Sequence, residues 1–401
     1  MNSYNLFRKL IAIGIITLFI GICFIPVTAK FQCDNKSILI EKHVGKFGSV
    51  FFDRLIMFLM RFGHIPSLST CIIKGDEVVW ANGYGLFDIE HNKNASEDTI
   101  YAVASISKTV TATALMQLYE QGFFELDEDI NDYLNFSIRN PNYPDDPITF
   151  RMLLSHHSSL DEDPWYLHKD YPGDCPVSFY PFLMEYLTPG GSEYSPEVWA
   201  DCRPGEEYHY ANMGYAIIGY LIEEMTGELF HQYCKDHIFI PLNMFNTSFL
   251  FADIDTENLA IPYMYCSWGY KPYMHAGDVD YPSGCLRTSV MELSHFVIAH
   301  MNGGVYDDIR ILEEDTVELM HTAQYTEDQP YGLGWKIYEN KRGEVFVGHG
   351  GGNIGVTTGM KIRVSDNTAV LFSINRETTL NIEILANQIL EKMLFLKANR
   401  I

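Results

Sequence analysis

The sequence predicts an α+β fold, in which an antiparallel sheet is flanked by helices and accompanied by a mostly helical lobe. Strand-like alternation occurs near the N-terminus at 68–84 and returns after Gly332, whereas helical spacing dominates between them. The hydrophobic content of 47% supports a packed core, and 401 residues exceed the usual size of a single core. We therefore expect one large two-lobed domain or two domains, with a sheet that the C-terminal third completes.

The first 29 residues have the composition of a targeting segment. Arg8-Lys9 precedes an apolar run from Leu10 to Ile25, and Val27-Thr28-Ala29 supplies small residues where a signal peptidase would cut. The apolar run is slightly short for a membrane span. A cleaved signal peptide and a retained membrane anchor at 1–29 both stay open, and either one predicts a secreted or cell-surface protein.

The next segments predict a helix followed by a strand pair. Residues 38–62 have amphipathic helical spacing, and 68–75 and 77–84 alternate on either side of the hairpin signal Lys74-Gly75-Asp76. An extended run at 99–104 then leads into a helix at 106–121 that Gly122 ends.

The middle of the chain predicts helices separated by loops. A short helical stretch covers 148–156, and the segment 161–208, rich in Asp, Pro, Gly and Tyr, is expected to be a loop. Helical spacing from Asn212 to Thr226 ends at Gly227, and a further helix runs from Met291 to Met301.

The C-terminal third predicts the rest of the sheet and a last helix. The expected strands are 333–338, 345–348, 356–364 and 368–375, and the helix runs from Thr379 to Leu396. The sheet lobe would then comprise about 38–105 and 285–401, and the helical lobe about 106–284.

Charge and cysteine content limit the partners and cofactors. The formal net charge is −24, and removal of residues 1–29 takes away two basic residues and leaves −26, so a nucleic-acid partner is not expected. Seven cysteines follow the targeting segment, and loop positions favour disulfides between Cys175 and Cys202 and between Cys266 and Cys285. Neither a Cys-x-x-Cys pair nor a His-Glu-x-x-His motif occurs, so no metal and no cofactor are implied.

Ser105-Ile106-Ser107-Lys108 is the first motif with chemical content. A Ser-x-x-Lys match arises about once by chance in a chain of this length, so its position decides its meaning. Ser105 would lie at the start of a helix, where unpaired N–H groups and the helix dipole favour developing negative charge. Lys108, three residues on, can reach the Ser105 hydroxyl, and a lysine in a dry pocket can lose its proton and activate the serine. The alternative is an N-cap serine followed by an ordinary lysine.

Two further motifs occur later in the chain. Tyr210-Ala211-Asn212 precedes a helix, where a phenol and an amide can face one cleft, although a packing tyrosine and an N-cap asparagine give the same pattern. His349-Gly350-Gly351-Gly352 adjoins a strand, and glycines there allow a backbone N–H to approach a ligand. The His-Gly-Gly-Gly oxyanion segment of lipase-type hydrolases is excluded, because it precedes a Gly-x-Ser-x-Gly elbow that this chain lacks.

Together the three motifs resemble those of the serine β-lactamase and penicillin-binding protein superfamily, in the same order. The likeness is greatest to the branch of class C β-lactamases, D-alanyl-D-alanine carboxypeptidases and esterases, whose second motif is Tyr-x-Asn. Further similar stretches are 148–160, 210–219, 241–248, 282–289 and 331–335. The resemblance implies a β-lactamase/transpeptidase-like fold and a single catalytic domain at 30–401.

The resemblance also implies roles for individual residues. Ser105 would be the acylated nucleophile, Lys108 and Tyr210 would share proton transfer, and Asn212, His349 and Gly351 would bind substrate. The backbone N–H groups of Ser105 and Gly352 would form the oxyanion hole.

One departure from the family pattern bears on the substrate. β-Lactamases usually have Lys in the third motif where this chain has His349, and an imidazole anchors a carboxylate less strongly than an ammonium. A serine hydrolase acting on a small-molecule or peptide acyl substrate, as a D-amino-acid peptidase or an esterase, is therefore expected. The alternatives are a β-lactamase and a penicillin-binding receptor or scaffold without turnover.

Overall fold

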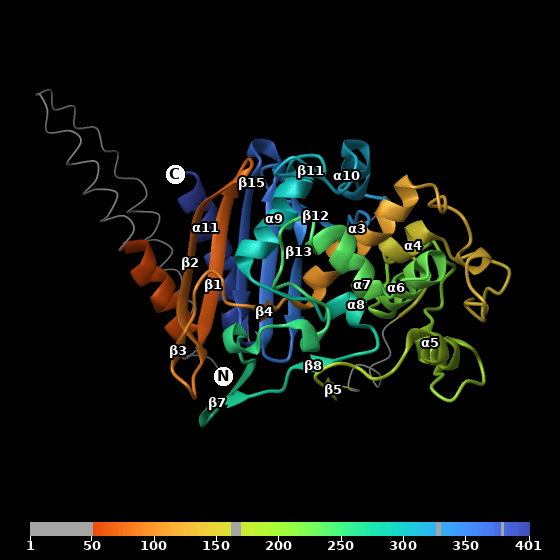
Figure 1. Cartoon of the computed structure of the whole chain (residues 1–401), viewed down its shortest axis with the longest axis horizontal. Helices are drawn as coiled ribbons and strands as arrows, with labels where there is room; N and C mark the ends of the chain where they lie inside the picture. The colour runs from red at the N-terminus through yellow and green to blue at the C-terminus, as the bar shows by residue number, and fades with distance from the viewer. Residues whose placement is uncertain (1–50, 162–169, 326–329, 378–380) are drawn as a thin grey trace, which may run out of the picture. The chain divides into compact units, whose positions relative to one another are not determined.

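A computed structural model describes residues 51–161, 170–325, 330–377 and 381–401. The chain divides into two compact units, Met1–Arg54 and Leu55–Ile401. The description below concerns the second, whose helices and strands are drawn in Figure 1. The predicted targeting segment at 1–29 lies outside the described residues, as does 38–50 of the first predicted helix, whose remainder at 51–62 is helical. In the described parts, no helix has the length and apolarity that a bilayer crossing requires.

The second unit is built on a seven-stranded sheet of order β12-β13-β14-β15-β1-β2-β3. Each neighbouring pair is antiparallel, which confirms the predicted sheet. Leu68 of β1 lies opposite Ile374 of β15, so segments from the two ends of this unit meet inside the sheet. The strands are β1 (Ser67–Lys74), β2 (Glu77–Asp88), β3 (Lys93–Asn94), β12 (Lys336–Glu339), β13 (Val345–Asn353), β14 (Val356–Arg363) and β15 (Thr368–Ile374).

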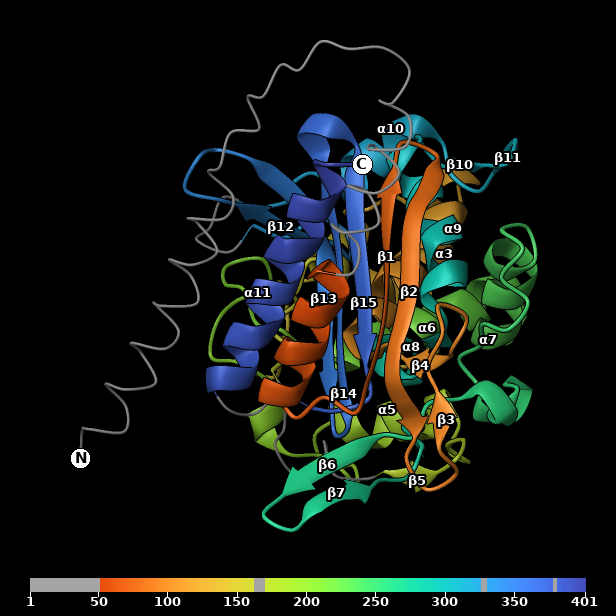
Figure 2. The same cartoon turned by 90° about the vertical axis from the view of Figure 1, so that its left-hand side faces the viewer.

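Helices cover both faces of this sheet. The helix α11 (Asn381–Ala398) packs on β1 and β15 from one side, and α9 (Val290–Met301) packs on the same strands from the other (Figure 2). Burial on both faces explains why β1 is buried from Ser67 to Ile73 instead of alternating with solvent. The predicted hairpin between β1 and β2 is confirmed, and Gly75 in its turn has a positive φ of 60°.

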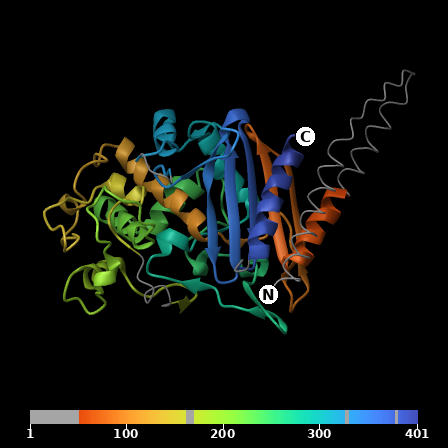
Figure 3. The same cartoon turned by 180° about the vertical axis from the view of Figure 1, so that it is seen from behind.

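The helical part lies beside the sheet (Figure 3) and centres on α3 (Ser107–Glu120). Residues 107–118 of α3 are all buried or nearly so, because α6 (Met213–Thr226) and α8 (Tyr281–Gly284) pack against it. The predicted end of α6 is confirmed, since Gly227 adopts the left-handed conformation with a φ of 73°. The remaining helices are α4 (Phe150–Leu154), α5 (Phe179–Leu187), α7 (Phe230–Cys234) and α10 (Glu314–Met320).

Short strands connect these layers. They form the pairs β4 (Tyr101–Ala102) with β9 (Arg287–Thr288), β5 (Tyr171–Pro172) with β8 (Ala276–Gly277), β6 (Tyr263–Cys266) with β7 (Gly269–Pro272), and β10 (Val305–Tyr306) with β11 (Ile309–Arg310). The pair β4–β9 holds the chain that enters α3, so it fixes the position of Ser105.

The expected loop at 161–208 is wrong in part. The helix α5 lies inside the segment expected to be a loop, because Phe179, Phe182 and Tyr186 share one face that is buried in the core. The surrounding Pro, Gly and Asp residues obscured this spacing.

The two expected disulfides are also wrong, because all four cysteines are free thiols. The backbone of Cys175 lies against Gly277, whereas the carbonyl of Cys202 accepts a hydrogen bond from Asn140 at 3.4 Å. The Cys266 thiol donates to the Gly269 carbonyl at 3.2 Å. Spacing along a loop did not indicate where these cysteines lie in the fold.

Candidate active site

Ser105 lies in a 3₁₀ turn, Ala104–Ile106, that leads directly into α3. The residue before it, Ala104, has a φ of 48°, a conformation that is costly for a residue with a Cβ atom. The surroundings hold this turn: the Val103 N–H donates to Leu286 at 2.9 Å and the Ser107 hydroxyl donates to the Ala104 carbonyl at 2.6 Å. The predicted place of Ser105 at a helix N-terminus is confirmed, and its side chain is half-buried.

Lys108 connects the first two motifs. Its side chain is 0% exposed, and its Nζ donates to Ser105 Oγ at 3.2 Å and to Asn212 Oδ1 at 2.5 Å. A third hydrogen bond reaches the Ser283 carbonyl at 2.9 Å, at the end of α8. Lys108 and Asn212, which are 104 positions apart in the sequence, are therefore in direct contact, and the amine of Lys108 joins the first two motifs.

Tyr210 lies between two lysines. The ring centroid of Tyr210 is 4.9 Å from Lys108 Nζ and 5.1 Å from Lys336 Nζ. Asn212, two residues on, is the N-cap of α6, so the start of this helix presents both side chains to the lysine. Two nearby cations stabilise negative charge that develops on a phenol, which suits Tyr210 to accept a proton.

The glycine run on β13 approaches the turn Ala104–Ile106 closely. A Cβ atom on Gly351 would lie 2.2 Å from the Val103 carbonyl oxygen and 2.3 Å from Thr358 Oγ1, so only glycine fits there. A Cβ atom on Gly352 would meet nothing within 4 Å, which leaves space beside that backbone. Assignment of the oxyanion hole to the N–H groups of Ser105 and Gly352, and of substrate binding to Gly351, stays a prediction.

His349 is held inside the protein. It is 1% exposed, with Nδ1 at 2.7 Å from the Gly350 carbonyl and Nε2 at 2.9 Å from the Tyr331 hydroxyl. Burial lowers its pKa well below the usual value, and the charges of Lys108 and Lys336 lower it further. The ring is therefore neutral, with an Nδ1–H that donates to Gly350 and an Nε2 that accepts from Tyr331. Its expected contact with substrate stays a prediction.

Lys336 is a site residue that the sequence motifs did not indicate. It begins β12 opposite Gly348 of β13, which places it next to the glycine run. Burial and the charge of Lys108 lower the pKa of Lys336. The residue follows the stretch 331–335 that the family resemblance had marked, yet a lysine in an alternating strand looks like an ordinary solvent-facing residue.

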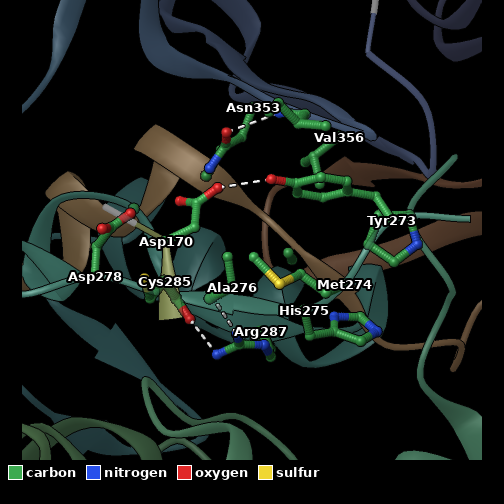
Figure 4. A pocket seen from close by; sticks show the side chains of 15 residues that line it. Asp170, Tyr273, Met274, His275, Ala276, Asp278, Cys285, Arg287, Asn353 and Val356 are labelled. Atoms are coloured by element: carbon green, nitrogen blue, oxygen red, sulfur yellow. Dashed lines mark hydrogen bonds between the residues drawn. The ribbon is translucent and has the colours of Figure 1, made fainter. Parts of the chain in front are cut away.

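A pocket with two aspartates in its wall adjoins the Ser105 turn. A cavity of about 30 Å³ is lined by Ala104 and Asn353, one from each side of the seam between the Ser105 turn and β13 (Figure 4). Asp170, which accepts a hydrogen bond from the Tyr273 hydroxyl at 2.9 Å, and Asp278 lie in its wall. Burial, followed by the charges of Asp280 and Asp170, raises the pKa of Asp278 to about 8.

The family model described as Beta-lactamase matches residues 52–391. "Protein flp" from Staphylococcus aureus (strain MW2) is 27% identical over 289 residues, which are 71% of this chain and 55% of that protein. The "Putative D-alanyl-D-alanine carboxypeptidase" of Escherichia coli (strain K12) is 26% identical over 324 residues, which are 72% of this chain and 71% of that protein. The chain thus spans about half the length of the first of these curated relatives.

Solved structures confirm the predicted fold. The octameric penicillin-binding protein homologue from Pyrococcus abyssi has a TM-score of 0.67 at 26% identity, over 86% of this chain and 77% of that chain. A class C beta lactamase from Rhodobacter sphaeroides has a TM-score of 0.66 at 17% identity, over 86% of this chain and 99% of that chain, and this likeness shows the fold alone.

Proposed function

Because the chain belongs to the beta-lactamase family, a family of serine hydrolases, we propose that it hydrolyses acyl substrates through an acyl-enzyme on Ser105. The observation that carries this proposal is the contact of Lys108 Nζ with both Ser105 Oγ, at 3.2 Å, and Asn212 Oδ1, at 2.5 Å. A buried amine shared by the hydroxyl and the amide is the arrangement that nucleophilic catalysis needs.

The proposed reaction has two steps. The pair of Tyr210 and Lys108 holds one proton fewer than its fully protonated form, so it can accept one. Ser105 Oγ attacks the carbonyl carbon of the substrate, its proton passes to this pair, and the N–H groups of Ser105 and Gly352 stabilise the oxyanion. Tyr210 and Lys108 then return the proton to the leaving amine or alkoxide as the acyl bond to Ser105 completes. Water then attacks the ester carbonyl and gives a proton to the same pair, and the pair passes that proton to Ser105 Oγ as the acid is released.

The proposed substrates are peptides or esters of the D-amino-acid peptidase or esterase type. The position of Lys336 supports a carboxylate-bearing substrate. Its ammonium lies beside Tyr210 and can bind a carboxylate, whereas the imidazole of His349 is neutral and offers no positive charge for that purpose. The name of the Escherichia coli relative refers to a carboxypeptidase of D-alanyl-D-alanine, which agrees with such a substrate.

A β-lactamase is the second candidate. The ammonium of Lys336 could hold a β-lactam carboxylate, so the absence of Lys at position 349 does not by itself disfavour this activity. A receptor that becomes acylated without turnover is the third candidate.

A turnover screen of D-amino-acid peptides, short acyl esters and nitrocefin, with Ser105→Ala as blank, separates these candidates. We expect D-amino-acid peptides or esters to be the preferred substrates. Preference for nitrocefin would establish the second candidate, and a burst of labelling without steady-state product would establish the third. Absence of fluorophosphonate and fluorescent-penicillin labelling of the wild-type protein would refute an acyl-enzyme altogether.

We also propose that the protein acts outside the cell or at its surface, since residues 1–29 have the pattern of a signal peptide or anchor. N-terminal sequencing of the protein from its host distinguishes cleavage after Ala29 from retention. A mature protein that stays in the cytoplasm with its N-terminus intact would contradict this location.

A further inference from the structure

Three potential metal ligands of different chemistry meet in the segment that leads to Tyr210. Cys202, Glu207 and His209 each offer one ligand atom, and these atoms all lie within 4.8 Å of one another. We propose that this cluster is a zinc site, separate from the hydrolytic groups and placed to hold the segment 202–209. The inference does not rest on the proposed hydrolase activity.

The ligand types favour zinc over other common metals. A thiolate, an imidazole and a carboxylate suit Zn²⁺, whereas Mg²⁺ and Ca²⁺ prefer oxygen ligands alone. Three protein ligands leave a fourth tetrahedral position for water. Cys202 is a free thiol that is only 4% exposed, so the sulfur is available inside the protein and is not taken up in a disulfide.

The distances fit a site that needs little adjustment. Tetrahedral zinc bonds of about 2.0–2.3 Å place neighbouring ligand atoms about 3.3–3.6 Å apart. His209 Nε2 already lies 3.5 Å from Glu207 Oε2. The remaining separations, at most 4.8 Å, close with side-chain movements of about 1 Å.

A neighbouring carboxylate supports the histidine. Asp161 Oδ2 lies 3.5 Å from His209 Nδ1, on the other side of the ring from Glu207. Metal-bound histidines almost always donate their second ring N–H to such a group, which fixes the ring and its tautomer. In this arrangement His209 Nε2 binds the metal and Asp161 orients the ring.

The backbone of the segment is already fixed. The Gly205 N–H donates to the His157 carbonyl at 2.7 Å, and the His209 N–H donates to the His156 carbonyl at 2.8 Å. The Arg203 N–H donates to the Glu206 carboxylate at 3.1 Å. A metal that links Cys202 to His209 would therefore clamp a shaped loop immediately before Tyr210, with little ordering cost.

Metal binding to the purified full-length chain tests the proposal. The protein is stripped with a chelator and titrated with Zn²⁺ against a chromophoric chelator, and we expect one equivalent bound. Co²⁺ in place of Zn²⁺ is expected to give the sulfur-to-metal charge-transfer absorption of a thiolate ligand. Both signals report on the site without any substrate, so they are independent of the hydrolytic activity.

Single substitutions identify the ligands. Cys202→Ala and His209→Gln are each expected to lower the zinc affinity at least ~100-fold, and Cys202→Ala to abolish the charge-transfer absorption. Glu207→Gln, at an exposed position that cannot disturb the core, is expected to lower the affinity ~10-fold or more. Cys266→Ala, which removes a thiol outside the cluster, is the matched control and keeps wild-type binding.

Two results would overturn the proposal. One is the absence of stoichiometric binding by the wild-type protein. The other concerns the variants: Glu207→Gln binds zinc with wild-type affinity, and so does Cys202→Ala or His209→Gln. Of these last two, only a variant with the circular dichroism spectrum of the folded protein is counted.

Discussion

At the scale of single residues, Lys108 is the side chain that contacts both of the first two motifs. One buried amine contacts the serine of the first motif, the asparagine of the second and the carbonyl of Ser283. Burying a lysine is costly unless its charge is satisfied inside the protein, so these contacts help to allow the burial of Lys108.

Lys108→Met keeps the volume of the side chain but removes the amine. We expect hydrolysis to fall ~10³-fold or more, because Ser105 loses the amine that contacts its Oγ and Tyr210 loses one of the two lysines beside it. The rate of fluorophosphonate labelling measures this loss. Lys341→Met, at an exposed position, is the control, and a Lys108→Met protein that labels at the control's rate would contradict the proposed mechanism.

Lys336→Met tests the carboxylate anchor. We expect KM for a carboxylate-bearing peptide to rise about 10- to 100-fold, the value of one hydrogen bond to a charged group, while a neutral ester keeps its KM. Steady-state kinetics with the two substrates separate the effects. An equal loss for both would mean that Lys336 acts only by positioning Tyr210.

At the scale of elements, the site depends on how closely β13 approaches the turn before α3. The Thr358 hydroxyl of β14 donates to the Val103 carbonyl at 2.8 Å, on the same oxygen that a Cβ at Gly351 would strike. The close approach of the strand to this turn is possible only because that position lacks a side chain.

Gly351→Ala is expected to push β13 away from the nucleophile turn. The predicted cost is about 1–3 kcal/mol of the free energy of unfolding, with a loss of activity of ~10²-fold as the oxyanion donor shifts. Denaturant unfolding and turnover measure the two effects. Gly350→Ala is the stability control, because its Cβ would meet only the Thr358 carbonyl at an ordinary 3.7 Å, and equal stability of the two variants would disprove the close fit.

The sequence indicated most elements and the three motifs, but not the residues that only the fold brings near them. The helix α6 and the hairpin of β1 and β2 were predictable because Gly227 and Gly75 mark their ends through local conformation. The position of Lys336 beside the glycine run was not predictable, because it depends on pairing with Gly348 twelve positions later in the chain. The cluster of Cys202, Glu207 and His209 was missed because its spacing matches no familiar metal pattern.

At the scale of the whole molecule, buried histidines make the fold sensitive to acid. Burial is the main cause of lowered pKa values at six histidines: the half-buried His231, His275, to about 4, and His321, to about 3, and the buried His156, His300 and His349, well below the usual value. In the unfolded chain each takes up a proton near pH 6.5, whereas the folded protein does not.

Stability is therefore expected to fall as the pH decreases below 6.5. The unfolded state binds more protons than the folded state from pH 6.5 down to about 3–4, so the free energy of unfolding decreases through that range. Melting temperatures measured from pH 7 to pH 4 check this expectation. A constant melting temperature from pH 6.5 to pH 4.5 would contradict it.

The ionisation of Asp278 makes stability depend on pH in the opposite direction to that of the histidines. Its pKa is raised to about 8, so the folded protein holds a proton that the unfolded chain releases near pH 3.8, and stability is lost as the pH rises between these values. We expect Asp278→Asn to have a higher melting temperature than wild type by about 1–3 °C at pH 8, and the difference to shrink towards pH 4. A difference that does not change with pH would contradict the assigned cause.

The pairing of Leu68 with Ile374 has a consequence for biosynthesis. On the ribosome, β1 and β2 emerge early but have no partner for the free edge of β1 until β15 has been made, some 300 residues later. Such a delayed, long-range pairing slows folding and leaves an exposed strand edge that neighbouring chains can bind. The yield of active protein is therefore expected to depend on molecular chaperones that shield apolar segments during synthesis. Substitutions that only slow the unfolding of the finished protein are expected to raise this yield less.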